Sequence, residues 1–387
     1  MRILWVVPRF GEDVVGGAET LVRELAKRAA PDGWTSEIAT TCAIDHETWE
    51  NVLEPGSSEE AGLLVHRFPV GERSQERYEA LRPLILDGRA TYLDELEWLA
   101  NSVWAPELDR FIERSGRDYD LIVYSPYLFG TTVWGAFIHP ERSALLPCLH
   151  DEGYARLETV RRAFETVKGC LFNSDGEARL AERLYDVRAR AVVGMGFDPP
   201  NGRPSEEFSA PRGLGQYVLY AGRLEAGKRV DVAVDYAVRY AAEREDAPRL
   251  VLSGRGSYKP PPWASGIVVE AGSLSTDERR AARAEALALV VPSVLESLSI
   301  VLLETWLDGT PALVARRSDV LRNHCEVSGG GLTFDSYEDY RDALDELRAD
   351  PEERTRMGAA GRAYVTEVYS WPAVRRRFES AAEMLAA

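Results

Sequence analysis

Two glutamates, Glu296 and Glu304, have surroundings in which a carboxylate could bind a ligand. The apolar, β-branched run at residues 286–291 precedes them and predicts a buried strand. Residues 299–307 have the length and composition of a helix that ends before a glycine. Glu296 would lie in the loop between strand and helix. Glu304 would lie on the apolar side of the helix, where an ionised carboxylate needs a partner or a ligand.

This pair of carboxylates suits hydroxyl groups, because carboxylate oxygens accept hydrogen bonds from the two hydroxyls of a vicinal diol. One glutamate could therefore bind a sugar ring and the other a ribose. The backbone N–H groups of Leu298, Ser299 and Ile300, at the expected start of the helix, could receive a phosphate or the sugar. Alternatively, Glu296 is a capping or surface residue and Glu304 is the buried partner of a cation.

Two cations follow another strand-like run, at residues 217–220. Gly222 and Arg223 come just after this run, and Lys228 lies a few residues later. The fork of an arginine and the point charge of a lysine both bind phosphate oxygens, so the two side chains could hold a diphosphate. Alternatively, Arg223 belongs to a surface salt-bridge network with Glu225, or one of the two cations is the buried partner of the second glutamate.

The first half of the chain contains two further candidate groups. Gly16 and Gly17 lie at an expected helix start, where the lack of side chains would let a phosphate approach the backbone, although a tight turn explains them equally well. Their spacing fits neither the dinucleotide fingerprint nor the P-loop. His150 follows the strand-like run 144–149 and precedes two carboxylates, so it is a candidate general acid or base, with a structural histidine as the alternative. No spacing of the other histidines predicts a metal site.

Strand-like runs alternate with helical patterns, which predicts doubly wound parallel sheets. The runs are residues 2–7, 37–41, 63–68, 119–124, 144–149, 169–173, 217–220, 249–253, 267–269 and 286–291. A chain of 387 residues exceeds the usual size of one core, so we expect two domains, joined by the turn-rich stretch 197–216. The helical insert that carries Trp98 and Trp104 is either an acceptor-facing excursion or a solvated helical pair.

The composition excludes several classes of protein. Lys and Arg number 46 against 63 Asp and Glu, a net charge of −17 that opposes binding to nucleic acid or anionic lipid. The 4 cysteines are far apart, which argues against a zinc site or a disulfide framework. The apolar start of the chain is too short for a signal peptide or a membrane span, so a cytoplasmic protein without transmembrane segments is expected. Peripheral membrane contact stays open.

Taken together, these motifs resemble glycosyltransferase family 4, whose members have the GT-B fold of two Rossmann-like domains facing a cleft. The resemblance spans nearly the whole chain. It rests on Gly16-Gly17-Ala18-Glu19, His150, Phe172-Asn173-Ser174 with Glu177, Gly222-Arg223 with Lys228, Pro292-Ser293, the pair Glu296 and Glu304, Gly309-Thr310-Pro311, and Ser370-Trp371. It implies an acceptor-side domain at residues 1–198, a nucleotide-sugar domain at 199–368, and a final helix at 369–387 that packs back on the first domain.

The resemblance also implies an activity: retaining, metal-independent transfer of a sugar from a nucleotide diphosphate sugar to an acceptor hydroxyl, in glycan or glycoconjugate biosynthesis. The acceptor would be a saccharide, a lipid-linked saccharide or a small molecule, and no cofactor or covalent nucleophile is implied. The resemblance implies that Arg223 and Lys228 bind the diphosphate, aided by the N–H group of Gly17. It implies that Glu296 and His150 contact the donor sugar and that Glu304 binds the ribose.

This sequence departs from the commoner family pattern at a few positions. Leu298 and Ser299 stand where many members have an aromatic residue and a glycine, Arg229 where glycine is frequent, and Asp308 where a small or apolar residue is more common. A sugar-nucleotide epimerase or a disaccharide phosphorylase of the same fold is an alternative, and so is a non-catalytic GT-B scaffold subunit. The intact set of cations and glutamates argues against the scaffold.

Overall fold

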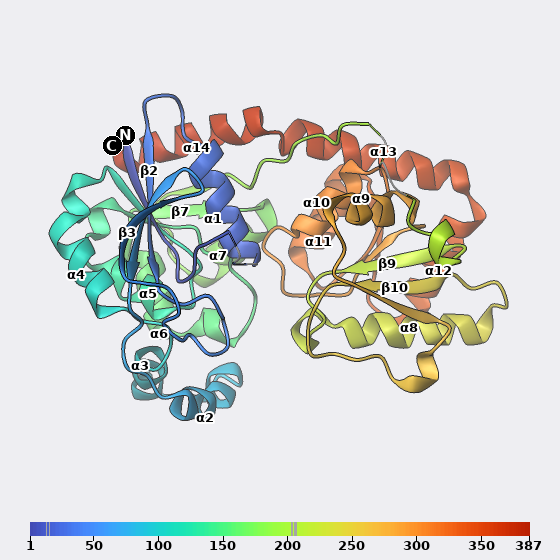
Figure 1. Cartoon of the computed structure of the whole chain (residues 1–387), viewed down its shortest axis with the longest axis horizontal. Helices are drawn as coiled ribbons and strands as arrows, with labels where there is room; N and C mark the ends of the chain where they lie inside the picture. The colour runs from blue at the N-terminus through green and yellow to red at the C-terminus, as the bar shows by residue number, and fades with distance from the viewer. Residues whose placement is uncertain (13, 15, 203, 205–206) are drawn as a thin grey trace. The chain divides into compact units, whose positions relative to one another are not determined.

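A computed structural model describes residues 1–12, 14, 16–202, 204 and 207–387. Asp13 and Val15 of the expected loop after the first strand, and Arg203, Ser205 and Glu206 of the expected linker, lie outside the described residues. The chain forms two compact units (Figure 1). Unit 1 comprises Met1–Gly196 and Trp371–Ala387, and unit 2 comprises Phe197–Ser370. The sequence places these boundaries after residues 198 and 368, two residues away in each case.

Unit 1 is built on a mainly parallel sheet, which within the described residues has eight strands in the order β3-β4-β2-β1-β5-β6-β7-β8. The strands are β1 (Arg2–Val6), β2 (Thr35–Thr41), β3 (Gly56–Glu60), β4 (Leu63–Phe68), β5 (Leu121–Tyr124), β6 (Ser143–Leu145), β7 (Gly169–Phe172) and β8 (Arg190–Val192). The predicted parallel sheet is confirmed, but β3 pairs antiparallel with β4 at the edge. This strand is polar and exposed, so no apolar pattern indicated it.

The helices of unit 1 are α1 (Gly17–Arg28), α2 (Gln75–Leu86), α3 (Tyr92–Ala100), α4 (Pro106–Ser115), α5 (Gly130–Val133), α6 (Glu158–Thr166), α7 (Asp175–Leu184) and α14 (Trp371–Ala386). The insert predicted after β4 forms α2 to α4. Trp98 of α3 is fully buried and stacks between Tyr78 and Tyr154, with ring centroids 5.1 and 5.0 Å away. The alternative of a solvated helical pair is therefore wrong, because the insert completes the core of unit 1. On α14, Phe378 stacks on Trp5 of β1 at 5.6 Å.

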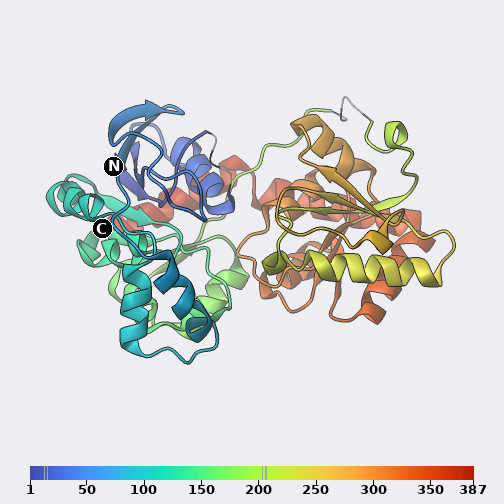
Figure 2. The ribbon, with the colours of Figure 1, turned by 60° about the horizontal axis from the view of Figure 1, so that its bottom comes forward.

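Unit 2 contains a parallel sheet, which within the described residues has six strands in the order β11-β10-β9-β12-β13-β14. The strands are β9 (Tyr217–Ala221), β10 (Arg249–Ser253), β11 (Val268–Gly272), β12 (Leu289–Val291), β13 (Ala312–Ala315) and β14 (Gly331–Phe334). The helices are α8 (Val230–Glu243), α9 (Thr276–Glu285), α10 (Ile300–Leu307), α11 (Asp319–Ser328), α12 (Tyr337–Ala349) and α13 (Pro351–Val368). Helix α8 lies on one face of the sheet and α9 and α10 on the other (Figures 1 and 2). Both faces are thus covered, as a parallel sheet requires.

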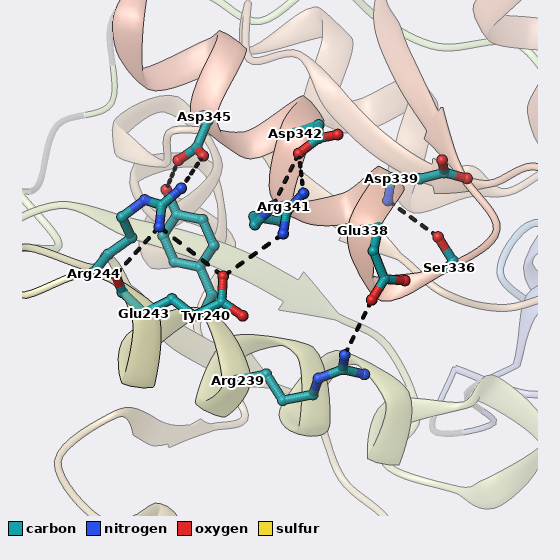
Figure 3. A network of polar contacts seen from close by, with 10 residues as sticks. All are labelled: Arg239, Tyr240, Glu243, Arg244, Ser336, Glu338, Asp339, Arg341, Asp342 and Asp345. Carbon is teal, nitrogen blue, oxygen red and sulfur yellow. Dashed lines mark hydrogen bonds and ion pairs between the residues drawn. The ribbon is translucent and has the colours of Figure 1, made fainter.

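Polar contacts join α8 to α12 on the face of unit 2 that carries α8 (Figure 3). Asp345 of α12 accepts hydrogen bonds from the Tyr240 hydroxyl and from Arg244 Nη2, the latter at 2.7 Å. Burial raises the pKa of Asp345, but these hydrogen bonds outweigh burial and leave its pKa lowered. Arg239 and Glu338 add a longer contact of 3.4 Å. Because most of these side chains are partly exposed, the network fixes the orientation of α12 more than it adds stability.

The predicted linker at residues 197–216 is only partly a linker. Phe208 is fully buried, and its ring lies 5.7 Å from that of Tyr217 on β9. Glu285 of α9 accepts hydrogen bonds from the backbone N–H groups of Phe208 and Ser209. The prediction is therefore wrong for the second half of this stretch, because the buried aromatic ring and these hydrogen bonds anchor it to unit 2. Within the described part of the chain, no helix combines the length and the apolar character needed to cross a membrane.

Candidate active site

The order of the strands in unit 2 reverses between β9 and β12. From β9 the chain proceeds outward to β10 and β11, and from β12 it proceeds in the other direction to β13 and β14. Ligands of open parallel sheets bind at such a switch point, beyond the carboxyl ends of the strands. The loop after β9 carries Gly222, Arg223 and Lys228, and the loop after β12 carries Glu296. The topology therefore brings together residues that are about seventy positions apart in the sequence.

Lys228 and Glu296 meet at this switch point. The Nζ atom of Lys228 lies 2.7 Å from Oε1 of Glu296 and 3.5 Å from the carbonyl oxygen of Leu295. The Lys228 side chain is 26% exposed and the Glu296 side chain 11% exposed, so the ion pair is largely shielded but still reachable from solvent. Lys228 ends a short 3₁₀ turn, and Arg229 follows it with a φ of +53°, at the position where glycine is frequent in the family. An ammonium group thus lies beside a carboxylate that can accept hydroxyl hydrogen bonds.

Arg223 is exposed and lies on the same loop. Its Nη1 atom is 3.1 Å from Oε2 of Glu225, and its side chain is 58% exposed. The surface salt bridge that we gave as the alternative is therefore present. Because an exposed ion pair contributes little free energy, Arg223 can exchange this carboxylate for a phosphate at low cost.

The backbone of this loop is held against the loop after β10. Gly222 N–H donates to the carbonyl of Ser253, and Leu224 N–H donates to that of Arg255. Gly222 has a φ of +149° and Gly254 a φ of +145°, and a Cβ atom on Gly254 would lie 1.8 Å from the Gly222 carbonyl oxygen. Glycine is required at Gly254 by this close approach of two backbones. The glycine-rich turn Ser253-Gly254-Arg255-Gly256 therefore positions the loop of the two cations.

Helix α10 begins where the sequence predicts it, directly after Ser299. Ser299 has a left-handed backbone with a φ of +64°, and its buried hydroxyl makes no hydrogen bond to any described residue. Leu298 is buried, and Ile300 is the first helical residue. The first N–H groups of a helix have no partner within that helix, so they can receive an anion. The strained serine takes the conformation that the glycine common in the family would adopt freely.

Glu304 is less buried than its apolar neighbours in the sequence suggest. Its side chain is 41% exposed, and Oε2 accepts a hydrogen bond from Nη1 of Arg283 on α9 at 3.0 Å. The expected buried position is therefore wrong, and so is the alternative that Arg223 or Lys228 is its partner. The geometry leaves Oε1 without a hydrogen bond to any described residue, so Glu304 can accept hydroxyl groups of a ligand.

In unit 1 the strand order reverses between β1 and β5. Gly16 is the N-cap of α1, and a Cβ atom there would lie 2.0 Å from Oε2 of Glu19. The Glu19 carboxylate is held by Arg9, whose guanidinium also donates to the carbonyl of Ile44 at 2.9 Å. Gly17 starts the helix, and nothing lies within 4 Å of the position that its Cβ would take. Gly16 is therefore required by the packing of Glu19, whereas Gly17 leaves its backbone open.

His150 lies in a loop and not at the end of a strand. The predicted strand 144–149 is wrong in length, because β6 ends at Leu145. Pro147 has no N–H to extend the ladder, and Cys148 has a left-handed φ of +51°. The His150 side chain is 27% exposed, and its Nδ1 atom lies 3.4 Å from Oε1 of Glu152. This contact links the imidazole to one of the two carboxylates that follow it.

A buried carboxylate supports the loop of His150. Glu177 of α7 is fully buried, and its two oxygens accept the N–H groups of Leu149 and Asn173, each at 2.6 Å. Burial raises the pKa of Glu177 to about 8, although the two amide hydrogen bonds oppose that shift. The Glu177 side chain thus connects the loops after β6 and β7. It fixes the backbone position of Leu149, the residue that precedes His150.

Residues 205–364, which make up most of unit 2, match the sequence model of the family described as "Glycosyl transferases group 1". Along almost the whole chain there are also relatives named as glycosyltransferases. The second unit of the chain therefore resembles the group 1 glycosyltransferases. The chain is similar to the D-inositol 3-phosphate glycosyltransferase of Nocardioides sp., with 27% identity over 95% of this chain and 85% of the relative. The same enzyme of Thermobifida fusca is 28% identical over 91% of this chain and 85% of the relative.

Solved structures agree with the fold of this chain. Sucrose-phosphate synthase from Thermosynechococcus elongatus superposes with a TM-score of 0.73 at 16% identity, covering 99% of this chain and 98% of the other. Anabaena HepE in complex with UDP and glucose gives a TM-score of 0.70 at 16% identity, covering 98% and 99%. The GT-B fold predicted from the sequence is therefore confirmed.

The sequence did not indicate every residue that shapes this candidate site. Arg283 had no local signal, because it lies in a polar, charged helix that resembles a solvated surface element. The one available hint was that Glu304 and Asp308 are four residues apart on a helix, so a single cation could contact both. Among the described residues, no three His, Cys, Asp or Glu side chains lie close enough together to hold a metal ion.

Proposed function

We propose that this protein is a glycosyltransferase, which moves a sugar from a nucleotide diphosphate sugar to an acceptor hydroxyl with retention of configuration and without a metal ion. The observation that carries this proposal is the contact between Lys228 and Glu296 at the switch point of unit 2, 2.7 Å long. It places a phosphate-binding cation directly beside a carboxylate suited to sugar hydroxyls. The relatives are named for D-inositol 3-phosphate, a phosphorylated polyol, which supports an acceptor that carries a phosphate, and HepE has been solved with UDP and with UDP-glucose.

In this mechanism Lys228 and Arg223 bind the diphosphate of the donor. As the bond to the sugar breaks, negative charge collects on the phosphate oxygens, so preorganised cations stabilise the transition state more than the ground state. Lys228 is preorganised because Glu296 already holds its ammonium group. Arg223 leaves Glu225 and joins the phosphate when the donor arrives. The two cations thereby take the part that a divalent metal ion has in other transferases.

The remaining groups bind and orient the sugar and the nucleotide. Glu296 accepts hydrogen bonds from the donor sugar, and Glu304 from the ribose. The N–H groups at the start of α10, next to Ser299, receive phosphate oxygens.

The proposed reaction has no covalent intermediate. The glycosidic bond to the phosphate breaks, the diphosphate leaves with the electron pair, and the acceptor oxygen forms its new bond on the same face of the sugar. The acceptor hydroxyl loses its proton in the same event, and the departing phosphate is the nearest strong acceptor for it. Retention follows, because both the leaving and the entering oxygen use one face.

The first test is a panel of nucleotide diphosphate sugars with different bases, each added to the protein before thermal unfolding. A ligand at about 100 times its Kd should stabilise the folded state by about 2.7 kcal/mol. The best donor is then incubated with inositol phosphates, sugar phosphates and unphosphorylated sugars, and the released nucleotide and the product are quantified. No stabilisation by any nucleotide would refute the proposal.

Product analysis separates the transferase from the other activities of this fold. Nuclear magnetic resonance of the product should show the anomeric configuration of the donor. An epimerase would convert the nucleotide sugar into its epimer without consuming an acceptor, and a phosphorylase would need inorganic phosphate. An inverted product would contradict retention while leaving the transferase assignment intact.

A further inference from the structure

A group of alternating charges lies between α9 and α10 in unit 2, outside the contact of Lys228 with Glu296. Arg283 of α9 is 9% exposed, and its guanidinium contacts two carboxylates. Its Nε atom donates to Oδ2 of Asp308 at 2.7 Å, and its Nη1 atom donates to Oε2 of Glu304 at 3.0 Å. Arg280 lies on the far side, with Nε 3.6 Å from Oδ1 of Asp308.

Asp308 fixes the guanidinium in this group. The Asp308 side chain is 3% exposed and lies between the two arginines, so its carboxylate is fully compensated. The backbone of Arg283 is also held, because the Thr310 hydroxyl donates to its carbonyl at 2.6 Å. A planar guanidinium with a fixed backbone and one fixed N–H can present its remaining N–H groups in only one direction.

Glu304 is the member of the group that faces outward. The Glu304 side chain is 41% exposed, whereas those of Arg283 and Asp308 are buried. Of these three side chains, Glu304 is therefore the one that a ligand can reach. Arg283 engages Oε2 and leaves Oε1 for a ligand. The guanidinium also compensates the charge of Glu304, which would otherwise repel an anionic nucleotide.

We infer that Arg283 is a positioning residue: anchored by Asp308, it holds the Glu304 carboxylate in the orientation that accepts the ribose hydroxyls of the donor. This inference rests on the proposed function, because it needs a nucleotide in unit 2. It also explains Asp308, which stands where the family more often has a small or apolar residue. A lysine at position 283 could not do the same, because a point charge lacks the fork that contacts two carboxylates at once.

The experiment compares nucleoside diphosphates with their 2′,3′-dideoxy analogues. Calorimetry gives the Kd of UDP, ADP and GDP and of the dideoxy form of each, and the ratio of the two constants measures the contribution of the ribose hydroxyls. In the unmodified protein we expect a ratio of tenfold or more for the base that binds. In the double variant Arg283→Gln/Asp308→Asn this ratio should fall to about threefold or less. The Kd of the dideoxy nucleotide should stay within about threefold of its value in the unmodified protein.

The double variant removes Arg283 together with its anchoring carboxylate, and Arg280, the other arginine beside Asp308, keeps its hydrogen bond to the carbonyl of Gly202. Glu304→Gln should lower the ratio to the same extent as the double variant. Arg239→Gln is the matched control, since Arg239 forms a surface ion pair with Glu338 on the other face of the sheet, and its ratio should not change.

The possible outcomes are separable. A double variant that keeps the ratio, or that weakens both nucleotides equally, overturns the positioning role and leaves the proposed function standing. An unmodified protein that binds both forms equally shows that Glu304 does not contact ribose, and this overturns the inference at its base. An unmodified protein that binds none of the six nucleotides overturns the proposed function and the inference together.

Discussion

Replacing Lys228 by methionine removes the cation that the structure places closest to Glu296. The loss of one charge-assisted hydrogen bond to phosphate corresponds to roughly 1.5 to 3 kcal/mol, or about 10- to 150-fold in kcat/KM. Two features of the structure favour the upper end. The ammonium group is already immobilised 2.7 Å from the carboxylate, and its removal takes a positive charge away from Glu296, which is only 11% exposed and would face an anionic donor. We therefore expect a loss near one hundredfold, mainly in kcat.

The assay is the release of nucleoside diphosphate from the best donor at saturating acceptor. Lys259→Met is the matched control, because Lys259 is 75% exposed and pairs only with Glu270 at 3.5 Å among the described residues. The double variant Lys228→Met/Glu296→Gln should lose less than the sum of the two single losses, since residues in contact are energetically coupled. A kcat/KM within twofold of the unmodified enzyme, or an equal loss in the control, would refute the diphosphate role.

Three further outcomes are expected. The proposed metal-free mechanism, in which Lys228 and Arg223 bind the diphosphate, predicts that activity persists in excess EDTA. Complete inhibition that added metal reverses would contradict it. Gly254→Ala should lower the free energy of unfolding of unit 2 by roughly 3 kcal/mol or more, because its Cβ would lie 1.8 Å from the Gly222 carbonyl oxygen. The control is Gly266→Ala, where φ is +87° and the space around the Cβ is open, and there the loss should be about 1 kcal/mol. Urea unfolding measures both. Burial lowers the pKa of His324 from its ordinary value of 6.5 to about 4. Between these two pH values the histidine is protonated in the unfolded chain but not in the folded one, so the stability of unit 2 falls as the pH is lowered. Hydrogen exchange of α11 should show about 2 kcal/mol lost between pH 7 and pH 5, and His324→Asn should lack this loss.

The fold was largely predictable because its signals are local and repeated. The buried strands of both units are short apolar runs, and each helix start or stop is marked by a few neighbouring residues. The failures had no such signal. Strand β3 is polar along its length, and the second half of the expected linker is anchored by the buried ring of Phe208 together with hydrogen bonds to Glu285. Composition measures the average of a segment, and one buried aromatic side chain can decide whether the segment packs.

The candidate site shows a different limit, since the identities of its residues were predictable and their partners were not. Lys228, Arg223, Glu296 and Glu304 offered several ways to pair, and the sequence could not choose among them. The choice is made by topology: the switch point brings the loop after β9 to the loop after β12, so Lys228 takes Glu296. Glu304 lies a turn and a half further along, beside α9, whose position depends on the packing of the whole sheet. The cation that pairs with Glu304 is Arg283, which belongs to α9, a helix whose sequence resembles a solvated surface element. Arg283 is anchored by Asp308, whose residue type departs from the family pattern. Where a helix places two carboxylates four residues apart on one face, the missing cation should be sought on the neighbouring helix.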